Sequence, residues 1–597
     1  MIALLGILSS AFLPFYNNFG TIYFVYYIDV LALLAAALVI ARKEIASQFA
    51  GIGRRGWYPI MAVIAAFLLV ELLLVQPYHL VYNDEYIYMS IAKSMITDHV
   101  FGICSFSTAT HCVPGTTGFF HQPGGWPLLL AVAFSIFGIG IGTAYYLTLL
   151  MSAISVLLVF LISYMLFSDA RQALMSSVAL ASIPLFLSYS RTSLADPSAL
   201  AFLLLSILLF MVYLRQKSLR TGFAAVMAFA FLTCIKTEMV IAVPILAGFL
   251  LLSSGWFRGR DARARIWKAV ALAAFAAVLL IPQMAFFYYS AQDSFGAAIY
   301  MDQSKLSLQN LGKNMQDNLL FWTGAFSTMR TSGGGVFSFV YHVEFPLTLT
   351  AFAVIGAAAM VALKKFRELA MLLVWFLAIF LFYTSYYAGS ALYGLGVDAR
   401  YFLGSFAALS VFAGYGFVQA YEFIRGMGKG RSRKRWGTPL LTMLFLLFIS
   451  MPLYQFVTIT MLPASTIAPY AGQRAGEAYL LSNLDKIPQN CTVITFKPPF
   501  WYVMNRSNIY ATWATSQSKR ATLMNMSHGC LYFDYDLNCY EGNRPGTGYG
   551  NTENECRAVL SNYTYETVST GNYTGYSWDV VWHIYRITGL SGTNSSG

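Results

Sequence analysis

The sequence predicts a polytopic α-helical membrane protein with a small α/β domain at its C-terminal end. Of its 597 residues, 58% are hydrophobic and only 11% are charged, whereas a soluble globular chain carries about 25% charged residues. The apolar residues form runs that approach the roughly 20 residues needed to cross a bilayer. The net charge of +12 comes from short basic clusters between these runs and not from one basic face. We therefore exclude nucleic acid as a partner.

Apolar runs account for most of the predicted transmembrane helices. Residues 1–15 form a shorter apolar stretch, which would make one further tilted span. A cleaved signal peptide is disfavoured there, because no basic segment precedes the stretch and no clear small-residue cleavage site follows it. We expect about 12–13 transmembrane helices in all. The other runs lie near residues 21–41, 57–76, 141–166, 173–190, 196–214, 221–236, 238–256, 268–290, 346–363, 369–387, 401–424 and 438–457.

Basic residues fall on the same side of the membrane when these runs alternate, and the positive-inside rule makes that side the cytoplasm. The basic clusters are Arg42, Lys43, Arg54 and Arg55; Arg215, Lys217 and Arg220; Arg258, Arg260, Arg263, Arg265 and Lys268; Lys364, Lys365 and Arg367; and Arg425, Lys429, Arg431, Arg433, Lys434 and Arg435. The predicted extracytoplasmic segments are 77–126, 191–195, 236–237, 291–345, 388–400 and 458–597.

Glycosylation sequons and cysteines also favour an extracytoplasmic C-terminal segment. Six N-x-S/T triplets occur after residue 458 and none before it, beginning at Asn490, Asn505, Asn525, Asn562, Asn572 and Asn594. Six of the seven cysteines lie in predicted external segments: Cys104, Cys112, Cys491, Cys530, Cys539 and Cys556. Even numbers per segment indicate disulfides in an oxidising compartment, although the four C-terminal cysteines allow three connectivities.

The composition changes after residue 458, which indicates a separate domain over 458–597. Residues 475–488 have the pattern of an amphipathic helix, and the following "CTVITF" that of a short buried strand. We divide the rest of the chain into additional N-terminal helices with a cytoplasmic loop over 1–56 and a membrane core over 57–457. The core carries a first external loop at 77–126 and a long one at 291–345.

The first external loop contains the strongest candidates for chemistry. Asp84 and Glu85 follow a span directly, at the depth of the membrane surface, where carboxylates are costly unless they are solvated or paired. The alternative is an ordinary pair of acidic residues at a helix N-terminus. The loop ends with His121 and Gln122 before a Pro- and Gly-rich break and a helix at about 126–138. That helix is too short to span, and we expect it at the interface with Trp126 in the aromatic belt.

Other external connections place ionisable groups near the same surface. Asp196 could instead be a simple helix cap before Pro197, and Lys236 could pair with Glu238. The long loop ends with His342 and Glu344, and Asp398 and Arg400 precede the run at 401–424. If the helices bundle, these groups converge on one cavity.

Together these motifs resemble the GT-C glycosyltransferases that use polyprenyl-phosphate sugars, in the branch of protein O-mannosyltransferases and aminoarabinose transferases. The resemblance covers roughly residues 57–457. It rests on the Asp84–Glu85 pair, "HQPGGWPLLL" with "FSIFG", "SRTSLADPSALAFLLL", "LTCIKTE", "YHVEFPLTL" and "DARYFLGSFAALS", in family order.

The resemblance implies a hexosyl- or pentosyltransferase that moves a sugar from a polyprenyl (dolichyl) phosphate to a glycan, protein or lipid acceptor. Asp84 is then the catalytic carboxylate, with Glu85 and Asp196 as further acidic residues of the site. Lys236, His342 and Arg400 match positions near the donor phosphate, and His121, Gln122, Glu238 and Tyr401 complete the predicted substrate-binding set. No cofactor is called for with certainty. A divalent metal ion is a possible cofactor, because metal dependence varies in the family.

Two other functions compete with this interpretation. An oligosaccharyltransferase catalytic subunit shares the architecture but carries a "WWDYG" motif, where this chain has only "GYSWDVVW" near its end. A transporter would place charges deep within spans and show internal repeats. Charged residues within the spans are scarce here, and the main ones are Asp29 and Glu71. The predicted location is a multi-pass plasma membrane with the active site and C-terminal domain outside, and the sequons with a polyprenyl donor favour an archaeon.

Overall fold

The structure is a computed structural model, and it describes residues 19–591 with gaps. The gaps are 76, 78, 80–81, 115, 119–122, 254–255, 257–260, 291–306, 313, 316–328, 331–335, 338–344, 386–398, 428–433, 462–475, 517–519, 521–522, 525–526, 528, 537–538, 540–551 and 574–579. The predicted site residues His121, Gln122 and His342 lie outside the described residues, as does the apolar stretch at 1–15.

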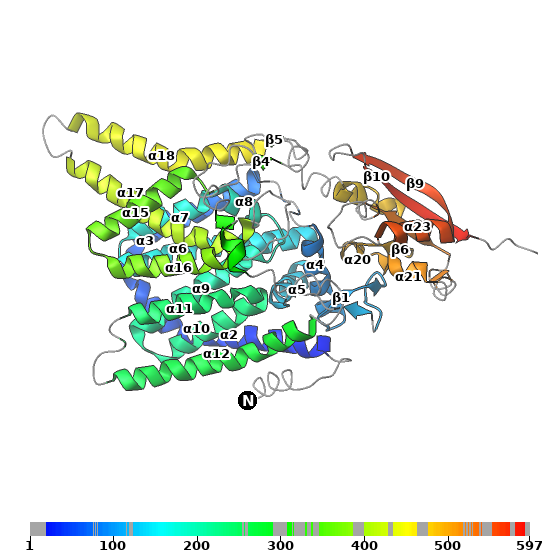
Figure 1. The fold of residues 1–597 in the computed structure, drawn as a ribbon, viewed down its shortest axis with the longest axis horizontal. Helices are drawn as coiled ribbons and strands as arrows, with labels where there is room; N and C mark the ends of the chain where they lie inside the picture. The colour runs from blue at the N-terminus through cyan, green and yellow to red at the C-terminus, as the bar shows by residue number, and fades with distance from the viewer. Residues whose placement is uncertain are drawn as a thin grey trace, which may run out of the picture.

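All twelve predicted apolar runs from residue 21 onward fall on helices, which form one bundle. Figure 1 shows this bundle on the left and the sheet domain on the right, with α4 and α5 between them. The helices of the bundle are α2 (Phe19–Phe49), α3 (Gly53–Leu73), α6 (Ile141–Phe167), α7 (Ala170–Ala181), α8 (Pro184–Ser190), α9 (Asp196–Gln216), α10 (Leu219–Ile235), α11 (Ala242–Leu252), α12 (Ala262–Ser290), α15 (Leu347–Ala362), α16 (Phe366–Thr384), α17 (Leu403–Met427) and α18 (Lys434–Met461).

Not every helix of the bundle is long enough to cross a membrane alone. In the described part of the chain, six helical stretches meet the length and composition needed, or seven if α7 and α8, bent by 68° at their junction, count as one span. The first of the six, residues 20–73, contains both α2 and α3. These two helices are separated by the turn η1 (Ala50–Ile52), and α3 begins at Gly53, whose φ of 62° is readily available to glycine.

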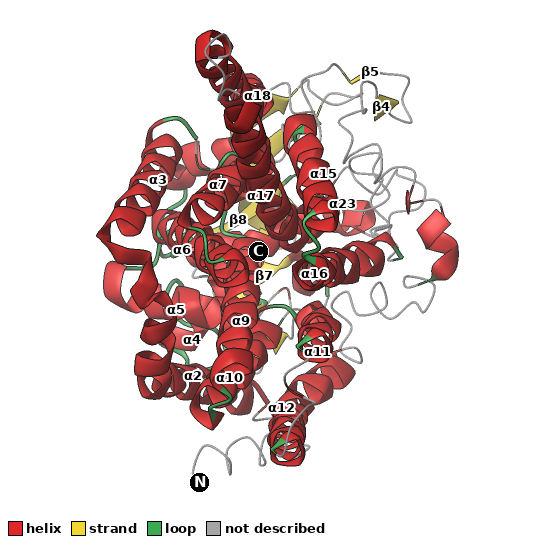
Figure 2. Cartoon of the chain, turned by 90° about the vertical axis from the view of Figure 1, so that its left-hand side faces the viewer, coloured by secondary structure: helices red, strands yellow, loops and turns green. Residues whose placement is uncertain are grey.

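The most buried helices lie in the middle of the bundle. Buried residues make up 89% of the apolar stretch of α17 and 83% of that of α9, but only 22% in α12 and 33% in α16. Figure 2 shows α9 and α17 surrounded by other helices, with α12 at the periphery. The exposed apolar faces of the outer helices are those that a bilayer would cover.

The first loop after α3 folds over the end of the bundle. It contains α4 (Tyr82–Thr97), the short strands β1 (Ile103–Cys104), β2 (Phe106–Ser107) and β3 (Thr117–Gly118), and α5 (Gly125–Phe137). A disulfide between Cys104 and Cys112 closes the hairpin-like segment after α4. The short helix predicted at 126–138 is confirmed as α5. The expected place of Trp126 in an aromatic belt is wrong, because its side chain is fully buried and its Nε1 donates to the Ser193 carbonyl at 2.9 Å.

The C-terminal domain is built on a mixed six-stranded sheet with the order β2-β7-β6-β8-β10-β9. The strands after β2 are β6 (Thr492–Thr495), β7 (Ser507–Tyr510), β8 (Leu531–Tyr535), β9 (Tyr563–Tyr573) and β10 (Val580–Leu590). β6 is parallel to both β7 and β8, whereas β10 is antiparallel to β8 and β9. The predicted helix and strand are confirmed at 476–482 and at β6.

The two faces of this sheet belong to different cores. Ile494 and Phe533 point to one face, where they pack with residues of α21 (Ala511–Thr515) and α23 (Thr552–Asn562). Val493 and Tyr532 point to the other face, which is continuous with α20 (Pro498–Val503) and with the core of the bundle. Alternate residues therefore bury both faces, which is why all four residues of β6 are buried.

Disulfides and one strand tie the parts of this domain together. The C-terminal cysteines pair as Cys491–Cys530 and Cys539–Cys556. The edge strand β2 comes from the first loop and pairs antiparallel with β7, Phe106 opposite Ile509 and Ser107 opposite Asn508. The sheet is thus completed by a segment about 400 residues earlier in the chain, which docks the domain on the loop that carries Asp84.

Candidate active site

Four of the predicted site residues are brought together by the ends of four elements. Asp84 lies in the first turn of α4, Asp196 is the first residue of α9, and Lys236 follows α10 directly. Arg400 belongs to the short helix η6 (Ala399–Phe402), which precedes α17. These four connections converge as predicted, whereas the end of the long loop with His342 and Glu344 lies outside the described residues.

Asp84 faces the guanidinium group of Arg400. Nη1 of Arg400 donates to Oδ2 of Asp84 at 3.4 Å, and its Nη2 donates to the Tyr401 hydroxyl at 3.3 Å. The two charged side chains are partly exposed, at 27% for Asp84 and 15% for Arg400. The carboxylate therefore has a charge partner and is still open to a substrate.

Lys236 is held between two carboxylates. Its Nζ lies 2.9 Å from Oδ1 of Asp196 and 3.0 Å from Oε1 of Glu238, and the predicted Lys236–Glu238 pair is confirmed. A buried ammonium is strongly disfavoured without such partners. The N-cap of α9 is Ala195 and Asp196 is the first helical residue, so Asp196 is not the predicted N-cap, and its buried carboxylate pairs with Lys236.

The ring of Tyr401 lies close to both cations of the site. Lys236 Nζ is 4.8 Å and Arg400 Cζ is 5.1 Å from its centroid, both within the range of cation–π attraction. The ring of Tyr383, at the end of α16, stacks on Tyr401 with the centroids 5.0 Å apart. The stack fixes the plane of the Tyr401 ring, which both cations approach.

A pocket opens beside these charges. Its polar end is formed by Asp196, Lys236, Arg400 and Tyr401, and the rest of its lining is mainly apolar, from Ala199, Leu200, Leu203, Met239, Ile379, Leu403 and Gly404. The cavity is small, and it joins a charged end to apolar walls.

Glu85 points in another direction, because neighbouring residues on a helix are about 100° apart. Its Oε2 accepts hydrogen bonds from the Ser193 backbone N–H at 2.7 Å and the Ser193 hydroxyl at 2.8 Å. The same oxygen lies 2.8 Å from Nδ1 of His79. Glu85 is fully buried, and it joins α4 to the segment that leads into Asp196.

Burial and charge act in opposite directions on the pKa of the Asp84 carboxyl. Burial raises it, the Arg400 guanidinium lowers it, and the nearby Asp196 carboxylate raises it again, so the pKa stays above that of an ordinary aspartate. A carboxylate in this state is a better proton acceptor at neutral pH than an unperturbed one.

Metal ligation involving His121 or His342 falls outside the described residues. Within the described part of the chain, no three His, Cys, Asp or Glu side chains lie close enough together to hold a metal ion. The place between Asp196 and Glu238 is taken by the Lys236 ammonium.

Comparisons with known proteins identify similar folds. Residues 121–293 match the family model described as dolichyl-phosphate-mannose-protein mannosyltransferase. No curated protein matches the chain by sequence. Among solved structures, ArnT from Cupriavidus metallidurans bound to undecaprenyl phosphate is similar with a TM-score of 0.53 and 14% identity, over 89% of this chain and 98% of that one. Apo ArnT matches with the same identity and coverage and a TM-score of 0.52.

The archaeal oligosaccharyltransferase AglB from Archaeoglobus fulgidus, in complex with an inhibitory peptide and a dolichol-phosphate, is similar with a TM-score of 0.51 and 15% identity. The match covers 87% of this chain and 74% of AglB. The chain has the GT-C fold of these structures. The GT-C bundle, with a charged site at the end that faces the C-terminal domain, is the architecture that the sequence motifs indicated.

Some residues that shape this candidate site were not predicted from the sequence. His79, Ser193, Tyr383 and the C-terminal Glu477 contact the predicted residues or their partners. His79 stands six residues before Glu85 in the same external segment, so proximity alone could have indicated it. Glu477 carries no local signal, because its contact depends on how the C-terminal domain docks.

Proposed function

We propose that the protein transfers a sugar from a polyprenyl (dolichyl) phosphate to an acceptor on the outer face of the membrane. The observation that carries this proposal is the pocket with a charged end and apolar walls, in which Arg400 both lines the cavity and contacts Asp84. A polyprenyl phosphate has the same two parts, a charged head and a hydrocarbon chain.

Each charged residue then has a chemical role. The Asp84 carboxylate accepts the proton of the acceptor hydroxyl while the hydroxyl oxygen attacks the anomeric carbon. The bond between that carbon and the phosphate oxygen breaks, and the negative charge moves onto the leaving polyprenyl phosphate. Arg400 and Lys236 lie where they can stabilise that charge. Asp196 and Glu238 hold Lys236 in position.

The comparisons support a lipid phosphate donor. ArnT is described bound to undecaprenyl phosphate and AglB in complex with a dolichol-phosphate. The chain covers 98% of ArnT but 74% of AglB, which favours a transferase of single sugars over an oligosaccharyltransferase. The sequons and disulfides support an extracytoplasmic location of the site and the C-terminal domain, and we propose an archaeal plasma membrane.

The test is transfer in vitro with purified protein and a panel of polyprenyl-phosphate hexoses and pentoses, with a lipid-linked oligosaccharide as a separate arm. Release of polyprenyl phosphate together with a glycosylated acceptor supports the proposal. Transfer only from the oligosaccharide donor would support the oligosaccharyltransferase alternative. No turnover of any donor would count against both functions.

A further inference from the structure

The helix that carries Asp84 is held from both sides. α4 packs against α5 of the first loop and against α20 of the C-terminal domain. Tyr86 and Lys93 are seven residues apart, so they lie on the same face of α4, and both contact the C-terminal domain. The ring of Tyr86 meets Phe500 edge-on with centroids 5.1 Å apart.

One attachment lies at the first turn of α4. The hydroxyl of Tyr86 donates to Oε1 of Glu477 at 2.5 Å, and Nε2 of His79 lies 3.2 Å from the same oxygen. His79 is 1% exposed, and its other ring nitrogen lies 2.8 Å from Glu85. Two carboxylates, one from α4 and one from the C-terminal domain, therefore flank one buried imidazole.

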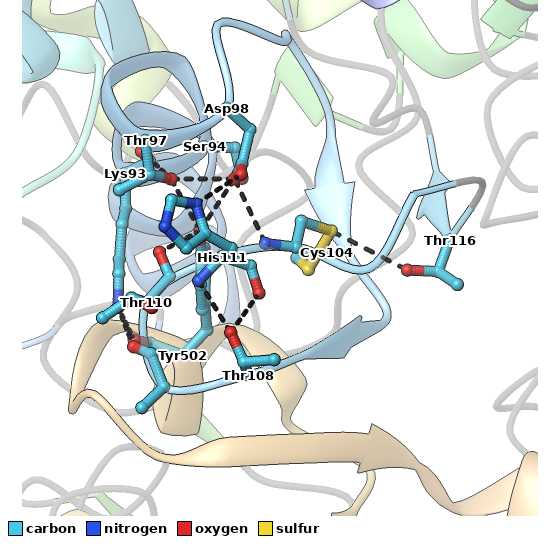
Figure 3. Close-up of polar contacts among 12 residues, drawn as sticks. Lys93, Ser94, Thr97, Asp98, Cys104, Thr108, Thr110, His111, Thr116 and Tyr502 are labelled. Atoms are coloured by element: carbon cyan, nitrogen blue, oxygen red, sulfur yellow. Dashed lines mark hydrogen bonds and ion pairs between the residues drawn. A yellow bond between two sulfur atoms is a disulfide. The ribbon is translucent and has the colours of Figure 1, made fainter.

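The second attachment lies near the C-terminal end of the same helix, and Figure 3 shows it. Nζ of Lys93 donates to the Tyr502 carbonyl at 2.6 Å, to Oδ1 of Asn505 at 2.8 Å and to the Ala109 carbonyl at 2.8 Å. Asp98 accepts from the Tyr502 hydroxyl at 3.2 Å and from the Cys112 backbone N–H at 3.2 Å. Together with the pairing of β2 and β7, these contacts attach the C-terminal domain to α4 and to the rest of the first loop at several points.

We infer that the C-terminal domain positions the catalytic helix, with Glu477 acting through His79 and Glu85 on the first turn of α4. The inference rests on the proposed function of Asp84. Glu85 is bonded to Ser193, three residues before Asp196, so its position sets how far Asp84 stands from the second acidic residue of the site. Glu477 is a positioning residue, because it contacts His79 and Tyr86 and acts on the reacting atoms only through them.

The charges around His79 make this link sensitive to pH. Burial lowers the pKa of His79, and the carboxylates of Glu85 and Glu477 raise it, with a net result above the ordinary value. The Tyr86 and Tyr145 rings and the Ser193 hydroxyl also face the imidazole, and Lys497 acts electrostatically on Glu477. Because the imidazolium is present below the pKa of His79, the link is complete there and weakens as the pH rises through it.

Glu477→Gln tests the inference. The glutamine side chain can still accept a hydrogen bond from the Tyr86 hydroxyl, but it no longer places a negative charge beside His79. The matched control is Glu566→Gln, the same change at an exposed position of β9 that pairs with Arg586 at 3.2 Å. We expect kcat of E477Q to fall by about tenfold or more, because small displacements of a catalytic group are costly. The donor KM should stay within about twofold, because the pocket is untouched. The alkaline limb of the pH–rate profile should move to lower pH in E477Q and stay in place in E566Q.

Hydrogen exchange of the α4 amides gives a second measurement that needs no activity. Exchange in the first turn of α4 should be faster in E477Q and more so in Glu477→Ala, with no change in E566Q. If the wild-type protein transfers sugar, and E477Q shows the same kcat, pH profile and α4 exchange as the wild type, the inference is overturned and the proposed function stands. Absence of wild-type turnover would remove the proposed function, and the exchange data would still decide whether Glu477 holds α4.

Discussion

Oδ2 of Asp84 lies 3.4 Å from Nη1 of Arg400, although 316 residues separate them in the chain. The contact joins the first loop to the start of α17, and it brings a partly exposed carboxylate to a pocket that Arg400 lines. It therefore connects the proposed base with the proposed site of the leaving phosphate.

Replacing Arg400 should remove both functions of this contact. We expect Arg400→Gln to lower kcat/KM for the lipid donor by about 10²-fold, the usual cost of losing one preorganised donor. Arg400→Lys keeps the charge but loses the planar guanidinium group, so its kcat/KM should lie between those of the wild type and R400Q. Steady-state kinetics with a fixed acceptor measures the difference. Wild-type kcat/KM in R400Q would show that the guanidinium takes no part in transfer.

The raised pKa of Asp84 predicts the acidic side of the pH–rate profile. Because the base must be ionised, kcat/KM should decline as the pH falls through a value above the roughly 3.9 of an ordinary aspartate. Arg400 lowers this pKa, so R400Q should move the acidic limb to still higher pH. A limb at the ordinary value, or one that R400Q leaves in place, would contradict the assignment of Asp84 as the base.

Lys93 predicts a pH dependence of folding stability. Burial lowers its pKa from 10.5 to about 8, so between these values the unfolded chain binds a proton that the folded chain does not. Stability contributed by this group should therefore rise with pH, by about 2 kcal/mol between pH 7 and pH 10. Thermal unfolding of the wild type and of Lys93→Met across this range checks the prediction. The rise should be missing from K93M, and equal slopes in both proteins would refute it.

A substitution at Gly404 tests whether the lipid donor occupies the apolar end of the pocket. A Cβ at this position would lie 2.6 Å from Cδ1 of Ile379 and 3.0 Å from Cδ2 of Leu203, both of which line the cavity. Gly404→Leu should fill the pocket and raise the donor KM by about tenfold, equivalent to about 1.4 kcal/mol. Gly426→Leu is the matched control in the same helix, because nothing lies within 4 Å of its Cβ position. Equal donor KM values for the two variants would place the lipid elsewhere.

The membrane part of the fold was predictable, because long apolar runs have few alternatives to a helix in a bilayer. Each of the twelve runs after residue 21 became a helix, and Asp84, Asp196, Lys236 and Arg400 met because alternating spans return their ends to the same side. Contacts of individual side chains were harder to predict from the sequence. Trp126 was expected at an aromatic belt but is buried, since hydropathy does not show which side of a short helix meets the bundle.

The contribution of the C-terminal domain was the least predictable part. "CTVITF" indicated a buried strand, but nothing in the sequence paired β7 with β2 of the first loop. The orientation of Glu85 away from Asp84 follows from helical geometry, yet its partners His79 and Ser193 depend on packing between distant segments. Glu477 and Lys93 became visible as contacts only once the domain was seated on α4.

Transfer by Asp84→Asn tests the central claim most directly. Asparagine keeps the size of the side chain but cannot accept the acceptor proton, so we expect kcat to fall by about 10²–10⁴-fold with the melting temperature unchanged. Asp485→Asn, an exposed carboxylate in the C-terminal domain, is the control and should transfer sugar at the wild-type rate. Transfer by D84N at the wild-type rate would contradict the account of the site.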